Sequence, residues 1–173
     1  DSRPRHSDAV LSMAYHPKGT AVASGSRDGS VRVWEVPTGR ELAQLPAHQG
    51  EVRAIAYSPD GDYLLTAGDD REVRLWDLKK QEISQRFAGH QEPITALAIS
   101  ADGKMVATGG GDRKLRLYER ATAKLLNELP GHGLSINGVA FSPDGKLVAS
   151  ACADQRLRVF DTANGGVKLA IPQ

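Results

Sequence analysis

The sequence contains very little of three features: cysteine, long apolar runs and an excess of charge of one sign. Its single cysteine, Cys152, excludes an internal disulfide and is typical of a reducing compartment, so we expect a cytoplasmic protein. No apolar run approaches the roughly 20 residues that a membrane-spanning helix needs. The 22 Lys and Arg residues against 21 Asp and Glu leave a net charge of +1. This balance creates no field that would attract nucleic acid or a membrane, and we expect neither as a partner.

What the sequence does contain is one pattern that recurs every 42 residues, without insertion or deletion. Each copy has a histidine, then a hydroxyl residue, an aspartate and an aromatic residue. The members are His6, His48, His90 and His132; Ser24, Thr66, Thr108 and Ser150; Asp28, Asp70, Asp112 and Asp154; and Trp34, Trp76, Tyr118 and Phe160. Self-similarity at such a period indicates repeated units that share their cores with their neighbours.

Each copy divides into four short segments that are typical of strands. In the second copy these are residues 52–57, 63–68, 72–78 and 82–88. The first is almost continuously apolar, which favours a strand covered on both faces, and the fourth is the most polar, as an outer strand should be. Ser-Pro-Asp-Gly at 58–61 is a turn sequence in which glycine supplies a positive φ. No segment has helical periodicity, so the sequence predicts an all-β fold.

The dipeptides Gly89-His90 and Trp76-Asp77, near the start and the end of a copy, are typical of a propeller blade at this period. Over essentially its whole length, the chain resembles the WD-repeat β-propeller family. The resemblance implies four four-stranded antiparallel blades, that is, a half or partial propeller. We expect the blades over residues 6–47, 48–89, 90–131 and 132–173, with residues 1–5 as the stub of a preceding outer strand.

In the family that the chain resembles, the indole N–H donates to the hydroxyl, the hydroxyl to the imidazole and the imidazole to the carboxylate. Two full networks are implied: His6, Ser24, Asp28 and Trp34, and His48, Thr66, Asp70 and Trp76. The third and fourth copies have Tyr118 and Phe160 instead of tryptophan, and phenylalanine has no donor. At most triads are implied there: His90, Thr108 and Asp112, and His132, Ser150 and Asp154. We therefore expect the loss of Asp70 to destabilise the chain more than the loss of Asp154.

These residue types are also those of a hydrolase triad, which is the alternative interpretation. The sequence has no G-x-S-x-G elbow, and four identical active sites on one small chain are improbable, so we expect no enzyme. Four arginines recur with the same spacing. We expect their side chains to cover the blade face, with the guanidinium groups paired to acids or stacked on aromatic rings, and a phosphate-binding ring is the alternative. The four arginines are Arg32, Arg74, Arg116 and Arg158. Because no complete calcium loop is present, we expect neither a metal nor a cofactor.

The resemblance favours a non-catalytic scaffold that binds a protein or peptide. The alternative is a sensor or docking domain of a larger multidomain enzyme or signalling protein. The family binds chiefly through the face where the His-bearing loops and the Asp turns open. In this sequence that face would present Ser7, Ala9, Arg27, Gln49, Glu51, Asp69, Gln91, Pro93, Gly111, Gly133, Ser135 and Ala153. The charged residues among them, Arg27, Glu51 and Asp69, favour a charged client on the first two blades.

Four blades in an arc leave one apolar face uncovered at each end of the chain. We expect two copies to associate into an eight-bladed ring, because small residues between the blades do not fill the wedge that a closed four-bladed ring would open. The alternative is completion by further blades of a longer parent chain.

Overall fold

The computed structural model describes residues 5–171, and every regular element within them is a β-strand. Blade 1 consists of β1 (Val10–Tyr15), β2 (Ala21–Ser26), β3 (Val31–Glu35) and β4 (Glu41–Leu45). Blade 2 consists of β5 (Val52–Tyr57), β6 (Tyr63–Gly68), β7 (Val73–Asp77) and β8 (Glu82–Phe87). Blade 3 consists of β9 (Ile94–Ile99), β10 (Met105–Gly110), β11 (Leu115–Glu119) and β12 (Leu125–Leu129). Blade 4 consists of β13 (Ile136–Phe141), β14 (Leu147–Cys152), β15 (Leu157–Asp161) and β16 (Val167–Ile171).

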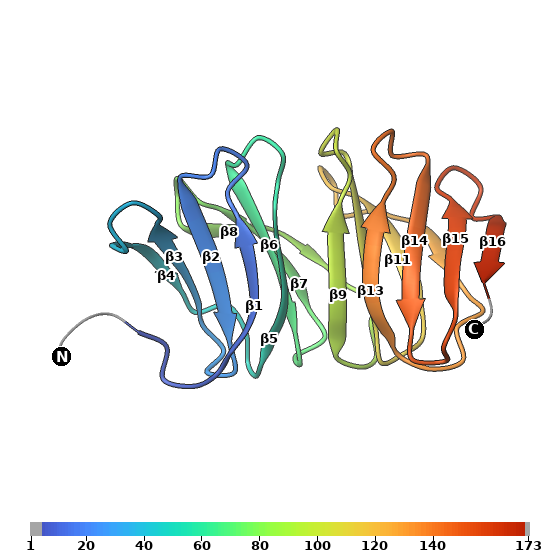
Figure 1. Ribbon diagram of the computed structural model, residues 1–173, viewed down its shortest axis with the longest axis horizontal. Coiled ribbons are helices and arrows are strands. Elements are labelled where there is room, and N and C mark those ends of the chain that lie inside the picture. Colours follow the sequence, from blue (N-terminus) through green and yellow to red (C-terminus); the bar gives the residue numbers. More distant parts are fainter. Residues whose placement is uncertain (1–4, 172–173) are drawn as a thin grey trace.

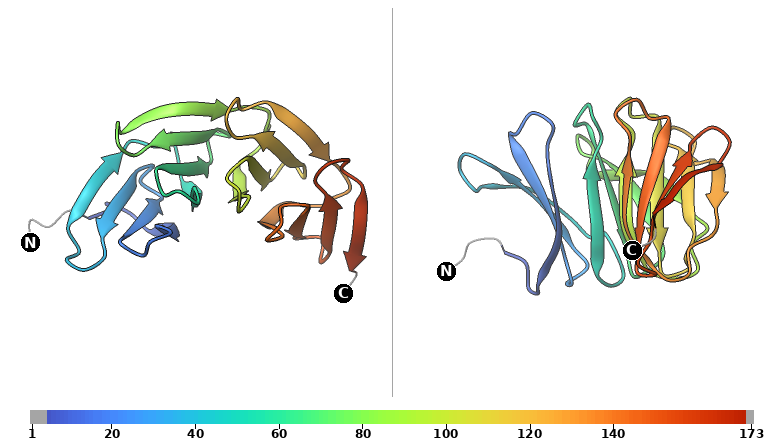
Figure 2. Two further views of the ribbon diagram at one scale, coloured as in Figure 1. Left: turned by 90° about the horizontal axis from the view of Figure 1, so that it is seen from above. Right: turned by 45° about the vertical axis from the view of Figure 1, so that its right-hand side comes forward.

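The strands of each blade form one antiparallel sheet in chain order. The four sheets stand side by side along an arc, with the first strand of each on the concave side and the last on the convex side (Figures 1 and 2). The predicted all-β fold of four four-stranded blades is confirmed. Along the described chain no helix is long and apolar enough to cross a membrane.

The strand limits in blade 2 differ slightly from the prediction. The third strand is Val73–Asp77 rather than 72–78, and the fourth is Glu82–Phe87 rather than 82–88. The paired strands end at Tyr63 and Asp77, and beyond them one further backbone hydrogen bond, from the Leu78 amide to the Asp62 carbonyl at 3.1 Å, continues the register into the turn. The predicted stub at residues 1–5 and the end of the last blade fall largely outside the described residues.

The turn at residues 58–61 forms as its sequence predicts. The Ser58 hydroxyl accepts a hydrogen bond from the Tyr63 amide at 3.0 Å, which closes the turn between β5 and β6. Gly61 has a φ of +80°, and a Cβ there would lie 2.2 Å from the His16 ring. Glycine is therefore required twice, by the backbone conformation and by the close approach of blade 1.

The apolar core lies between the blades. We call the side of a blade that faces the preceding blade its front, and the other side its back. The back of blade 1 contributes residues such as Val31 and Val33, and the front of blade 2 contributes Ile55, Leu64 and Trp76. Two similar clusters join blade 2 to blade 3 and blade 3 to blade 4. Each blade is therefore stabilised by its neighbours.

The front of blade 1 and the back of blade 4 have no neighbour within residues 5–171. Met13 is 64% exposed, whereas Ile55 at the same repeat position in blade 2 is 9% exposed. Leu157 is 40% exposed, whereas Val31, Val73 and Leu115 at its position are 0% exposed. The two open faces that the sequence predicts are thus present. The front face carries Val10, Met13, Tyr15, Val22 and Trp34; the back face carries Leu147, Ala149, Leu157, Val159, Leu169 and Ile171.

Candidate interaction face and its supporting networks

The loops before the inner strands and the turns after the second strands lie along one edge of the arc, the lower edge in Figure 1. We call this edge the loop face. In each blade one backbone hydrogen bond joins the two segments. The amides of Arg27, Asp69, Gly111 and Ala153 donate to the carbonyls of Ala9, Glu51, Pro93 and Ser135 at 2.9, 3.1, 2.9 and 2.9 Å. These bonds bring together, in pairs, eight of the residues that the sequence singled out for partner binding.

The other four residues of that set are held through their backbone amides by the aspartates of the repeat. The amides of Ser7, Gln49, Gln91 and Gly133 donate to the carboxylates of Asp28, Asp70, Asp112 and Asp154 at 2.8, 3.1, 3.3 and 2.8 Å. None of the twelve predicted binding residues is buried. The loop face is therefore an accessible surface whose backbone is held by the aspartates of the repeat.

Blades 1 and 2 contain the complete networks that the resemblance implies. In blade 2 the Trp76 indole donates to the Thr66 hydroxyl at 3.1 Å, and His48 joins Thr66 at 2.8 Å to Asp70 at 2.7 Å. In blade 1 the bond from the Trp34 indole to Ser24 is 2.8 Å, and His6 lies 2.7 Å from Ser24 and 3.3 Å from Asp28. The longer His6–Asp28 distance accompanies a competing contact, since Ser30 Oγ lies 3.1 Å from the same ring nitrogen.

Blade 3 keeps the triad and uses its tyrosine differently. His90 lies 2.7 Å from the Thr108 hydroxyl and 3.0 Å from Asp112. The Tyr118 hydroxyl donates to the carbonyl of Ala88 at 3.0 Å, so it ties the third strand to the loop before His90.

Blade 4 departs from the expected triad. His132 lies 2.7 Å from the Ser150 hydroxyl, but its Nδ1 has no hydrogen-bond partner among the described residues. Asp154 instead accepts two hydrogen bonds from Arg158, at 3.1 and 2.8 Å. The predicted link between His132 and Asp154 is therefore wrong, and Phe160 contributes only its ring, 5.7 Å from the His132 ring.

The other repeat arginines also pair with acids, and two of them, Arg74 and Arg116, each contact two carboxylates. Arg32 pairs with Glu41 at 2.7 Å. Arg74 contacts Asp70 and Glu72 at 2.9 and 2.8 Å. Arg116 contacts Asp112 and Glu128 at 2.6 and 3.0 Å. Through Asp70 and Asp112, Arg74 and Arg116 are part of the support for the loop face, a role that the four-residue pattern alone does not reveal.

The charged residues of the loop face on blades 1 and 2 pair with one another. Arg27 contacts Glu51 at 2.9 Å, and Arg53, which the sequence reasoning missed, contacts both Glu51 and Asp69. Further along the face the guanidinium groups of Arg71 and Arg113 donate to carbonyls of the next blade, those of Gln91 and Gly133. Glu51 and Asp69 are thus already paired with arginines in the folded chain. Their spacing in the sequence could not show this.

The networks shift the pKa values of their members. Burial lowers the pKa of His48, His90 and His132. The pKa of Asp70 is lowered overall. Burial by itself would raise this pKa, but hydrogen bonds from His48 and from the Gln49 amide, together with the charge of Arg74, outweigh the effect of burial. The Arg158 hydrogen bonds and the Gly133 amide lower the pKa of Asp154. Neutral imidazoles beside ionised aspartates are consistent with a structural network.

The same geometry argues against catalysis at these residues. The hydroxyl residues Ser24, Thr66, Thr108 and Ser150 are all buried. A nucleophile needs access to its substrate, and in blades 1 and 2 the hydroxyl also accepts the indole N–H. Within residues 5–171 no group of three His, Cys, Asp or Glu side chains is arranged to hold a metal ion.

An arc of four sheets, each with one hydrogen-bonded group of polar side chains, defines a propeller-type repeat protein. The family model described as "WD domain, G-beta repeat" matches residues 2–35, 39–77, 81–119 and 123–161. The chain belongs to the WD-repeat family, and the resemblance inferred from its sequence is confirmed.

Curated relatives share a much shorter stretch. The chain is 57% identical over 37 residues to the ribosome biogenesis protein erb1 of Neurospora crassa, which covers 21% of this chain and 5% of that protein. It is 57% identical over 35 residues to the ribosome biogenesis protein BOP1 homolog of Arabidopsis thaliana, which covers 20% and 5%. The corresponding protein of Drosophila virilis is 51% identical over 35 residues, which covers 20% and 4%. The matched stretch spans about a twentieth of these relatives.

Proposed function

We propose that this chain is a non-catalytic interaction scaffold that binds a protein or peptide client on its loop face. The proposal is supported above all by the loop face itself. In every blade one backbone hydrogen bond joins the loop to the turn, so four equivalent loop–turn pairs lie along one edge. In every blade the repeat aspartate accepts a hydrogen bond from the loop amide beside it, and a preorganised surface loses little entropy when it binds. The same face would serve a docking domain of a larger protein equally well.

The client's footprint is expected on blades 1 and 2. There the loop face carries the alternating charges of Asp8, Arg27, Glu51, Arg53 and Asp69. Exposed ion pairs exchange partners at little cost, so a charged segment can replace the pairs among these residues. In blades 3 and 4 the paired loop and turn residues, Pro93, Gly111, Ser135 and Ala153, carry no charge. The exposed charges of blade 3 on this face, Glu92 and Arg113, are fewer than those of blades 1 and 2.

Site-specific photo-cross-linking in the source cells tests this function. A cross-linking residue at Gln49, on the loop face of blade 2, is compared with one at Lys104, an exposed residue on the opposite edge of blade 3. We expect a defined protein product from position 49 that disappears with Arg27→Ala and Arg53→Ala together. A product from position 104 alone, or one that ignores both arginines, would contradict the proposal.

The curated relatives are named as ribosome biogenesis proteins. Each match is shorter than one 42-residue repeat, so what is shared is the blade. Cytoplasmic location stays a prediction from the single cysteine.

The two open faces support a further part of the proposal: the isolated chain pairs with a second copy into an eight-bladed ring. The back of blade 4 presents Leu157 and Ile171 at the positions where Val31 and Leu45 on the back of blade 1 receive the front of blade 2. A second copy offers the matching front, with Met13 and Tyr15 where blade 2 has Ile55 and Tyr57. In a longer parent chain, further blades would cover the same faces.

Light scattering measures this association. One copy has a mass of 18.5 kDa, and we expect twice that mass for the isolated chain. Met13→Asp on the front face or Leu169→Asp on the back face should return the monomer. Leu134→Asp is the matched control, because Leu134 is 53% exposed on the loop face and Asp8 and Glu92 occupy its position in blades 1 and 3. A monomer at all concentrations rules the ring out.

A further inference from the structure

The interfaces between neighbouring blades differ in one layer, near the edge of the arc opposite the loop face. There the back of each blade contributes two side chains, one from its second strand and one from its fourth, which we call the back pair. The next blade contributes one side chain, from the turn after its third strand, which we call the front residue. In chain order the back pairs are Ala21 and Ala43, Tyr63 and Gln85, Met105 and Asn127, and Leu147 and Leu169, and the front residues are Val36, Leu78, Arg120 and Thr162.

The interface between blades 2 and 3 is polar in this layer. The Arg120 guanidinium lies 5.1 Å from the centre of the Tyr63 ring. The Gln85 amide crosses to blade 3 and donates to the carbonyl of Ala121 at 2.9 Å. The guanidinium also donates to the carbonyl of Gly103 in its own blade. An arginine at the front residue is therefore received by a ring, an amide and a carbonyl.

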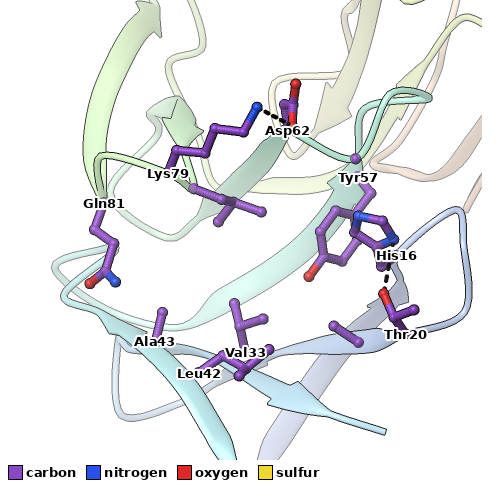
Figure 3. A pocket seen from close by; sticks show the side chains of 12 residues that line it. His16, Thr20, Val33, Leu42, Ala43, Tyr57, Asp62, Lys79 and Gln81 are labelled. Carbon is purple, nitrogen blue, oxygen red and sulfur yellow. Dashed lines mark hydrogen bonds and ion pairs between the residues drawn. The ribbon is translucent and has the colours of Figure 1, made fainter.

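The other two inner interfaces follow the same rule. Between blades 3 and 4, Asn127 donates to the carbonyl of Thr162 at 3.0 Å. Between blades 1 and 2, Leu78 packs into the cluster that holds Ala21 and Ala43, and a pocket stays open beside the two alanines (Figure 3). An apolar front residue thus meets an apolar back pair, and a polar front residue meets a back pair that contains an amide.

The two open faces carry this layer without its counterpart. Leu147 and Leu169, on the back of blade 4, have no polar atom in their side chains, and Leu169 is 48% exposed. Val36, on the front of blade 1, is the smaller of the two apolar front residues and is 44% exposed. Two leucines facing a valine reverse the first interface, where two alanines face a leucine. The two open faces therefore match each other both in polarity and in size.

The inner strands offer a second match. The Thr95 hydroxyl of blade 3 donates to the carbonyl of Ile136 in blade 4. Asn137 occupies the position of Thr95 in blade 4 and is exposed. Its amide is available to the corresponding carbonyl of a following blade 1, which is that of Val10. The open back of blade 4 thus presents a donor where blade 3 uses one.

We propose that the back of blade 4 recognises the front of blade 1 of a second copy through the contact of Leu147 and Leu169 with Val36. This inference rests on the eight-bladed ring proposed above and adds the residues that select the partner. A ring of two copies makes the contact twice. A front residue with a charge is rejected, because its guanidinium or ammonium group would be buried against two leucines without a partner.

The dissociation constant of the dimer, measured on the full chain by sedimentation over a dilution series, tests this contact. Val36→Arg should raise it at least about a hundredfold. Blade 1 should stay folded, since the carbonyl of Gly19 corresponds to the carbonyl of Gly103 that receives Arg120. Leu147→Tyr with Leu169→Gln, which copies the back pair of blade 2, should also weaken the dimer. All three changes together should restore the constant to within about tenfold of the wild-type value.

Leu126→Arg is the matched control. Leu126 is 43% exposed on the outer strand of blade 3, away from both open faces, and Lys168 occupies its position in blade 4. This change should leave the dissociation constant as it is. A wild-type chain that stays monomeric overturns the ring and this inference together and leaves both faces to further blades of a longer parent chain. A wild-type dimer that survives Val36→Arg, or that the triple variant fails to restore, overturns the matched contact alone.

Discussion

Blades 2 and 4 carry the same histidine and aspartate with an equivalent hydroxyl residue, yet they connect them differently. In blade 2, His48 bridges Thr66 and Asp70. In blade 4, His132 reaches Ser150 but not Asp154, and Arg158 takes both oxygens of that carboxylate. Matching residues at matching positions therefore do not guarantee the same network.

The cause lies outside the four repeated positions. Arg74 has a second carboxylate in Glu72, and Arg116 has one in Glu128. Arg158 has none within residues 5–171, because those positions hold Arg156 and Ala170 in blade 4. A buried guanidinium needs a carboxylate, so Arg158 draws Asp154 away from the imidazole. The comparison teaches that the supply of acids around the arginine decides where the aspartate binds.

The largest expected effect separates the two aspartates. Asp154→Ala leaves buried Arg158 without a carboxylate, whereas Asp70→Ala leaves Arg74 with Glu72. We expect Asp70→Ala to cost about 2–4 kcal/mol, and we expect Asp154→Ala to lower the urea midpoint further than Asp70→Ala does. This reverses the order that network length alone suggests. Urea melts of both variants measure it.

A double variant identifies the cause. Asp154→Ala with Arg158→Met should recover most of the loss, because a buried pair is replaced by apolar groups. If Asp70→Ala proves the more damaging change, or if the methionine brings no recovery, the guanidinium is not what distinguishes the blades.

Acid should affect the same two blades in a definite order. Burial lowers the pKa of His48 and His132 below the value of 6.5 that they have when unfolded. The unfolded chain then binds more protons, so stability is full above pH 6.5 and falls as the pH drops through the folded pKa. A protonated His48 keeps Asp70 as its partner, whereas His132 faces Arg158. As the pH falls from 7.5 to about 5, we expect the NMR amide signals of blade 4 to disappear before those of blade 2.

A smaller effect concerns the indole donors. Trp76→Phe removes the hydrogen bond to Thr66 and gives blade 2 the aromatic residue of blade 4. We expect a loss of about 1–2 kcal/mol in chemical melts. Trp34→Phe is the control, because Trp34 lies on the open front of blade 1 and is only partly buried. Equal losses would show that burial by a neighbouring blade does not matter here.

Most of the fold could be predicted from the sequence because its determinants are local. Strand limits follow from turns such as 58–61, where Ser58, Asp60 and Gly61 act on their own backbone. The period of 42 residues then places every blade in the same register. The pairing of loop and turn on the loop face follows from that register as well.

Contacts between residues outside the repeated pattern could not be predicted in the same way. Arg53, in β5, pairs with Asp69, which follows β6. Arg158 pairs with Asp154 because no second carboxylate lies beside Arg158 within residues 5–171. Between blades 1 and 2 an open pocket lies beside Ala21 and Ala43, which look like ordinary core alanines in a single copy. Only comparison with Tyr63 and Gln85, once their contacts are known, shows that side chains are missing there.

The smallest predicted effect is the most specific one. Ala170 lies directly across from Arg158, as Glu128 lies across from Arg116 in blade 3. Ala170→Glu should therefore give Arg158 a second carboxylate and release one oxygen of Asp154 to His132, for a gain of less than about 1 kcal/mol. The sharper readout is the ¹⁵N resonance of His132 Nδ1, which should shift toward that of His48 as the hydrogen bond forms. Ala170→Gln, which has the shape but not the charge, should leave the resonance where it is. If glutamate also fails to move it, the geometry of blade 4 is set by Phe160 and the open back face rather than by the balance of charges.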